Sequence, residues 1–171
     1  NTLLIVARFY QANTYQRHTQ SLELAANQLR MTMESDLDGV FLMQAARDAN
    51  KQVIDFRLIE VNSTACKQLN MTRDALIGEL ICELFPINRT NGFFEQYKQV
   101  IETGETLLED YQVPDAEIGV RWYKHQVVRV DEDNDNLVIY NRDITQQKQY
   151  ELDLVKQRNQ LQSLIESQTS Y

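Results

Sequence analysis

The stretch Tyr140-Asn141-Arg142-Asp143-Ile144-Thr145-Gln146-Gln147-Lys148 marks the point where a β-rich chain becomes helical. The apolar run 137–140 precedes the change, and the polar sequence after it contains no Gly or Pro. We therefore expect a strand to end and a helix to begin at Asp143. Either Asp143 or Thr145 can cap that helix, because a short side-chain oxygen accepts hydrogen bonds from the first free helical N–H groups.

Composition limits the partners of the chain. Its 171 residues are 43% hydrophobic and 25% charged, with a formal net charge of −8. We expect no nucleic-acid partner, since nucleic acids and anionic membranes attract clustered Lys and Arg. The two cysteines, Cys66 and Cys82, are too few for a disulfide framework and indicate reduced cytoplasmic thiols, with one bridge as the alternative.

The N-terminal segment carries a coiled-coil pattern. Residues 2–34 lack Gly and Pro, and apolar residues recur at alternating steps of three and four. We expect segment 1–36 to be a signalling helix that pairs with a second copy as a parallel homodimer; an amphipathic helix lying on the domain is the alternative. The expected seam residues are Ile5, Ala12, Tyr15, Leu22, Ala26, Leu29 and Met33.

The same segment opens with a short apolar run at residues 3–7. This run is far shorter than the roughly 20 apolar residues of a membrane-spanning helix. It fits the tail of a membrane helix further upstream and a helix–helix contact equally well. The chain starts without Met, so we expect it to be part of a longer protein.

Residues 37–145 have the pattern of an α+β domain with an antiparallel sheet. Alternating apolar residues bounded by turn residues predict strands at 40–46, 52–61, 106–113, 120–130 and 137–143. Helical segments are expected at 65–69, 72–78, 79–85 and 93–103, the last with Gly104 as its C-cap. The alternation slips at Ile59, which indicates a bulge. A connection is expected to begin at Pro114, and residues 146–171 form the C-terminal linker helix.

Short motifs in this domain resemble those of PAS domains. In chain order they are Asp38-Gly39-Val40-Phe41, Val61-Asn62-Ser63-Thr64-Ala65-Cys66, Leu76-Ile77-Gly78-Glu79, Leu84-Phe85-Pro86, Arg121-Trp122-Tyr123 and Asp143-Ile144-Thr145. Their shared order and spacing carry the likeness. The resemblance implies a PAS-like five-stranded antiparallel sheet, helices packed on one face, and an internal pocket between them. Long N- and C-terminal helices would flank the domain.

The resemblance also implies a function. PAS domains are commonly cytoplasmic, dimeric sensor modules of bacterial signal-transduction proteins, placed before histidine kinases, diguanylate cyclases or phosphodiesterases. No effector signature occurs in this sequence, so the effector domain is expected elsewhere in the full-length chain. Membrane attachment would come only through an upstream helix. The relay to the effector is expected to run through Asp143, Ile144 and Thr145 into the outgoing helix.

The implied pocket is expected to bind an apolar or aromatic small molecule, with Tyr97 as its polar contact. The expected wall residues are Leu42, Phe56, Leu58, Leu69, Leu76, Leu80, Leu84, Phe94, Tyr97 and Val100. The alternative is a core filled by its own side chains. The domain would then be a ligand-free dimerisation or protein-interaction module.

Cofactor signatures are missing from the sequence. Haem-binding PAS domains usually carry an axial His on the helix that corresponds to 93–103, which has none. We interpret His125, on an expected strand, as a structural or surface residue. Flavin photoreceptors of the family need a reactive Cys in an Asn-Cys-Arg segment, whereas Asn88-Arg89-Thr90 lacks it. We expect a colourless protein without a cofactor.

Metal and catalytic motifs are missing as well. The acidic loop 131–136 alternates Asp like a calcium loop, but Asn136 and Arg142 stand where Gly and Glu are required. No nucleophile elbow, zinc motif or phosphate loop occurs. We expect no metal site and no enzyme activity; a small enzyme with an unrecognised site is the remaining alternative.

Overall fold

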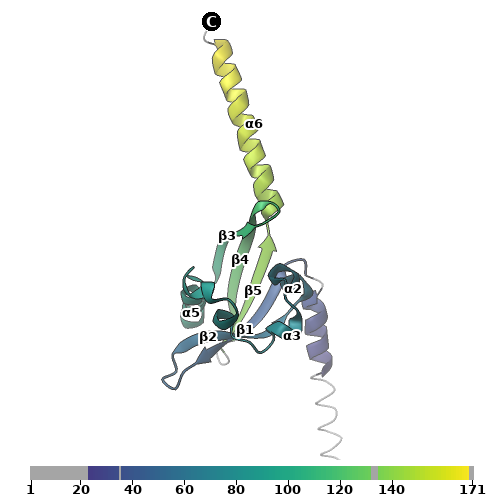
Figure 1. Cartoon of the computed structure of the whole chain (residues 1–171), viewed down its shortest axis with the longest axis vertical. Coiled ribbons are helices and arrows are strands. Elements are labelled where there is room, and N and C mark those ends of the chain that lie inside the picture. The colour runs from purple at the N-terminus through teal and green to yellow at the C-terminus, as the bar shows by residue number, and fades with distance from the viewer. Residues whose placement is uncertain (1–22, 35, 132–134, 170–171) are drawn as a thin grey trace, which may run out of the picture.

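The computed structural model of the chain describes residues 23–34, 36–131 and 135–169. The described strands form one antiparallel sheet in the order β2-β1-β5-β4-β3. Their bounds are β1 (Gly39–Arg47), β2 (Val53–Val61), β3 (Leu107–Asp115), β4 (Gly119–Asp131) and β5 (Asn136–Asp143). The first and last strands lie side by side at the centre, so the entrance and exit of the domain are neighbours (Figure 1).

Helical segments connect β2 to β3. They are α2 (Ser63–Leu69), α3 (Arg73–Leu76), α4 (Ile81–Leu84), the 3-10 turn η1 (Pro86–Arg89) and α5 (Phe93–Thr103). Gly104 ends α5 with a left-handed φ of 74°, and its N–H donates to Val100 O, as expected for a C-cap glycine. These elements confirm the α+β, PAS-like architecture expected from the sequence.

The slip in the β2 pattern is a bulge. Leu42 pairs with Glu60, whereas the next residue, Met43, pairs with Leu58, so Ile59 is the extra residue. Because of this extra residue, Leu58 and Val61 both face the core, although an odd spacing would otherwise put them on opposite faces. The predicted bulge is confirmed.

Strand β3 runs further than expected. Pro114 pairs with Val120 and Asp115 with Gly119, so the connection does not begin at Pro114. Proline has no N–H to donate to a neighbouring strand. In an edge strand, the N–H groups on one side have no neighbouring strand, so a proline there removes no sheet hydrogen bond. Since β3 is an edge of the sheet, it accommodates Pro114.

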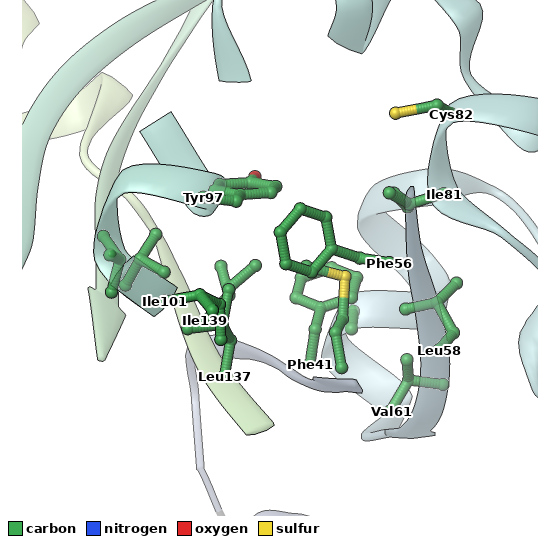
Figure 2. Close-up of a cluster of buried hydrophobic side chains, with 14 of the residues drawn as sticks. Phe41, Phe56, Leu58, Val61, Ile81, Cys82, Tyr97, Ile101, Leu137 and Ile139 are labelled. Atoms are coloured by element: carbon green, nitrogen blue, oxygen red, sulfur yellow. The ribbon is translucent and has the colours of Figure 1, made fainter. Parts of the chain in front are cut away.

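The core lies between the sheet and the connecting helices. Phe56 is completely buried at its centre, with Tyr97 on one side and Ile81 on the other (Figure 2). The Phe56 ring meets Tyr97 and Phe94 edge-on, with centroids 5.7 and 6.1 Å apart. Edge-to-face rings add to the stabilisation that burial of apolar surface already supplies.

The N-terminal helix covers residues 23–34 in the described part of the chain. Asn62 fixes its end, since the Nδ2 atom donates to Met33 O at 2.9 Å and to Asp38 O at 2.8 Å. The Oδ1 atom accepts from the N–H groups of Val40 and Ala65, both at 2.9 Å. One buried amide therefore joins the incoming helix, β1 and α2.

The expected dimer seam is only partly described. Ala26 and Leu29 are exposed on the N-terminal helix, and Met33 is half-buried. Ile5, Ala12, Tyr15 and Leu22 lie outside the described residues.

Helix α6 (Thr145–Thr169) projects away from the sheet (Figure 1). Its side chains from Gln149 to Gln168 are exposed, including Leu154, Leu161, Leu164 and Ile165. No helix within the described ranges is long and apolar enough to cross a bilayer.

Candidate functional site

A cavity of about 610 Å³ lies between the inner face of the sheet and the segment from α4 to α5. Phe41, Met43 and Ile139, from the central strands, form its apolar floor. Ile87 and Asn91 line it and are exposed, so they lie at its mouth. Its size falls within the roughly 300–1,000 Å³ of small-molecule pockets.

An aromatic cluster forms one wall of the cavity. Phe93 and Tyr97 lie four residues apart on α5 and therefore share a face of that helix. Tyr111 and His125 come from the inner faces of β3 and β4. The ring centroids of Phe93 lie 5.1 Å from Tyr111 and 5.2 Å from His125. The wall thus presents ring surface from three elements.

His125 is the buried polar centre of this wall. It is 1% exposed, its Nδ1 lies 2.5 Å from Asn141 Oδ1, and its Nε2 lies 3.1 Å from the Tyr97 hydroxyl. An amide oxygen only accepts, so Nδ1 carries the proton and Nε2 accepts from Tyr97. Burial lowers the pKa of His125, against smaller opposing effects of Asn141 and Glu109, so the imidazole is neutral at pH 7.

Of the two interpretations of His125, structural or surface, the surface one is therefore wrong and the structural one stands. His125 alternates with Tyr123 and Val127, which are also buried, on the inner face of β4. That alternation was visible in the sequence. The signal that we missed was a polar residue at a position that alternates with buried apolar residues.

The tyrosines of the wall are neutral hydrogen-bonding groups. Burial raises the pKa of Tyr97 well above its ordinary value. Burial also raises the pKa of Tyr111, while a hydrogen bond from Asn141 acts in the opposite direction. Both hydroxyls keep their protons at pH 7 and orient groups rather than exchange protons.

Glu109 is the one charged side chain among the described residues that line the cavity, given the neutral His125. It lies half-buried on the inner face of β3, opposite His125 in the strand register. Its Oε2 accepts a hydrogen bond from Gln96 Nε2 at 3.0 Å. The sequence pattern Leu107-Glu109-Tyr111 placed this carboxylate on the inner face, but our selection of apolar wall residues passed over it.

Among the expected wall residues, only Leu69 and Tyr97 line the cavity. The others fill or surround the neighbouring core: Phe56, Leu58, Leu76 and Val100 are buried within it, Leu84 and Phe94 pack against it, and Leu42 and Leu80 are half-buried outside the cluster. Leu42 points to the opposite sheet face from its buried neighbours Phe41 and Met43. These residues were wrongly expected in the cavity wall. An apolar pattern identifies residues that face the interior, but it does not show which of them border a cavity.

The junction with α6 lies at the end of β5. Asp143 Oδ1 accepts from Thr145 N at 2.9 Å, which makes Asp143 the side-chain cap of the helix. Ile144 is 3% exposed, and its N–H donates to Trp122 O at 2.9 Å. Thr145 Oγ1 accepts from Trp122 N at 2.9 Å. Arg121 pairs with Asp143 at 3.0 Å and so completes the connection to β4.

Lys148, three residues after Thr145 in the first turn of α6, adds a second attachment. Its Nζ lies 2.9 Å from Asp110 Oδ2 and 5.4 Å from the centre of the Trp122 ring. The hydrogen bond from Lys148 lowers the pKa of Asp110. The first turn of α6 is therefore fastened to both β3 and β4, on the sheet face away from the cavity.

Redox and metal chemistry have little support in the described part of the chain. Cys66 and Cys82 are free thiols. Burial raises the pKa of Cys82 to about 12 and also raises that of Cys66, so neither is poised as a thiolate. Within residues 23–34, 36–131 and 135–169, no three His, Cys, Asp or Glu side chains gather to hold a metal ion.

Comparison with protein families places the fold in a known class. The family model described as "PAS fold" matches residues 54–149, more than half of the chain. The chain therefore belongs to the PAS fold family. A search of curated proteins returned no significant match.

Solved structures share this architecture. A domain of a sensory box sensor histidine kinase/response regulator from Geobacter sulfurreducens matches at TM-score 0.51 and 20% identity, covering 71% of this chain and 96% of its own. The PAS domain of an HTR-like protein from Haloarcula marismortui gives 0.53 and 18%, with coverages of 75% and 99%. A LOV protein from Rhodobacter sphaeroides gives 0.52 and 10%, with coverages of 71% and 68%. These likenesses are likenesses of fold.

Proposed function

We propose that this chain is the signal-input module of a bacterial signal-transduction protein. It binds a small molecule with an apolar or aromatic body in the cavity and relays occupancy through its flanking helices. The effector is a histidine kinase or a cyclic-di-GMP enzyme in the same full-length chain. The observation that carries this proposal is the cavity of about 610 Å³, which is lined by β4 and β5, the strands that also hold the start of α6.

The relay has a short covalent path. Asn141, which contacts His125 in the cavity wall, lies two residues before Asp143 on β5. His125 likewise lies three residues after Trp122, the anchor of Thr145, on β4. A ligand that shifts β4 against β5 would move both sides of the junction. Two arrangements of the junction that differ in ligand affinity are the requirement for signalling.

A homodimer fits the flanking helices. The apolar residues of α6 are exposed in the single chain, and an isolated polar helix gains stability when such a stripe is covered by a partner. Ala26 and Leu29 offer a similar surface on the N-terminal helix. A reducing cytoplasm suits the two free thiols, Cys66 and Cys82.

Native mass spectrometry and absorbance of the purified chain test the binding. We expect a colourless protein that holds a small molecule, which unfolding releases. A mass equal to that of the bare chain would favour the alternative, a ligand-free dimerisation module. Most of the expected wall residues pack into or against a filled core, and this packing favours the alternative.

A reporter fusion tests the relay. The chain is joined to a kinase or cyclase, and the molecule released from the purified protein is added back. Asp143→Ala/Thr145→Ala should fold and bind but lose the response, at a cost of about 1 kcal/mol for the lost cap. Gln146→Ala, in the same turn but bonded to Tyr150 rather than to β4, is the matched control. A double variant that binds and still switches the reporter would refute the relay.

A further inference from the structure

The three carboxylates of β3 differ in whether a cation lies beside them. Asp110, on the outer face, lies 2.9 Å from Lys148 and 3.6 Å from Lys124. Asp115 lies 2.9 Å from Arg121. Glu109, which faces the cavity, has no cation within ion-pair distance among the described residues, and its bond from Gln96 comes from a neutral amide. The one carboxylate in the cavity wall is thus the one whose charge is not balanced.

The side chain next to Glu109 has an unused acceptor. Gln96 lines the cavity and donates through Nε2 to Glu109, and its Oε1 is buried without a hydrogen-bond partner. A buried acceptor without a donor is costly, and a half-buried carboxylate such as Glu109 is stabilised by a counter-ion that it lacks here. Both needs are met by one kind of group, a cationic nitrogen with several N–H donors.

The rest of the wall suits the same group. The rings of Phe93, Tyr97 and Tyr111 border the cavity, and aromatic faces attract organic cations. His125 adds no positive charge because burial lowers its pKa, and its N–H is already donated to Asn141. An anionic ligand would meet the Glu109 carboxylate with no compensating cation among the described lining residues.

We propose that the cavity selects an organic cation, an amine or ammonium group on an apolar or aromatic body, with Glu109 as its counter-charge. This inference rests on the proposed function and narrows the ligand class of the same site. Glu109 and Gln96 receive the nitrogen, and the aromatic wall and apolar floor receive the body.

Three probes test the charge preference: 2-phenylethylamine, 2-phenylethanol and 3-phenylpropionate. They share a phenyl ring and a chain of similar length, and their end groups are cationic, neutral and anionic. Their binding to the full chain is measured by calorimetry and by NMR titration at pH 7. The ammonium should bind about tenfold or more tightly than the alcohol, which is about 1.4 kcal/mol, and the carboxylate should bind most weakly. Raising the salt concentration should weaken the amine selectively.

Glu109→Gln keeps the shape of the side chain and should bring the amine and the alcohol to similar affinity. Asp110→Asn, the adjacent carboxylate on the outer face, should leave the order of the probes unchanged. Equal affinities in the wild-type chain, tightest binding of the carboxylate, or an unchanged order in Glu109→Gln would each overturn the inference.

The outcomes separate this inference from the proposed function. If the alcohol binds as well as the amine, the charge preference is wrong and binding in the cavity stands. If no probe binds, the inference is overturned, and native mass spectrometry of the purified chain still decides whether the cavity holds a molecule.

Discussion

Asn62→Ala is the sharpest test of how the incoming helix is attached to the domain. Asn62 is 1% exposed and makes four hydrogen bonds through one amide, two as acceptor and two as donor. The partners are backbone groups of Met33, Asp38, Val40 and Ala65. The substitution leaves two N–H and two C=O groups without their partner.

The expected cost follows from that inventory. A net contribution of about 1 kcal/mol for each hydrogen bond gives a loss of about 4 kcal/mol in the free energy of unfolding. Removal of the α2 cap alone would account for about 1 kcal/mol of this. A domain with a total stability of about 5–15 kcal/mol would be severely destabilised.

Urea unfolding followed by circular dichroism measures the loss, and hydrogen exchange locates it. Asn62→Asp separates the two halves of the amide, because it keeps the acceptor for Val40 and Ala65 but places an oxygen against two carbonyls. It should therefore loosen the end of helix 23–34 more than α2. Asn50→Ala, on the exposed β1–β2 turn, is the control and should change stability by less than about 0.5 kcal/mol. A loss below about 1 kcal/mol in Asn62→Ala would refute the reasoning.

Three further outcomes are expected. Phe56→Ala should lower the free energy of unfolding by about 3–5 kcal/mol in urea titrations, because the ring is fully buried; a loss near 1 kcal/mol would mean that the core collapses onto the gap. Burial lowers the pKa of His125 below its ordinary value of 6.5, so the unfolded chain takes up the proton first. Its stabilisation is therefore complete above about pH 6.5 and declines as the pH falls toward 5, by at most about 1.4 kcal/mol per pH unit; His125→Gln should flatten that decline, and an unchanged slope would contradict the assignment. Lys148→Gln should speed hydrogen exchange in the first turns of α6 but not in the core, because Lys148 fastens that turn to Asp110 and Trp122; equal exchange in both proteins would remove Lys148 from the junction.

The sheet and its helices could be predicted because local rules coincide with the fold. The slip at Ile59 predicted the bulge, Gly104 predicted the end of α5, and Asp143 predicted the start of α6. Pro114 misled the prediction, since its effect depends on whether a strand lies at an edge. Strand order is a non-local property that a single stretch of sequence does not carry.

The cavity wall was the part least accessible from the sequence. An apolar pattern marks every inward-facing residue alike, and a void forms where side chains from different elements fail to meet. The better indicator was polarity on an inward face, as for Glu109 on β3 and His125 on β4. Gln96 would not have been found in this way, because its position beside Glu109 depends on how α5 packs against the sheet.

The measurement that tests the central claim most directly compares hydrogen exchange of the chain with the proposed ligand bound and with it removed. We predict that removing the ligand speeds exchange at residues 93–99, the part of α5 that carries the lining residues Phe93, Gln96 and Tyr97, and at residues 143–150, which begin α6. The second change is the essential one, because those residues lie on the far side of the junction from the ligand. A change confined to 93–99, with 143–150 exchanging identically in both states, would contradict the claim that occupancy of the cavity is relayed to the output helix.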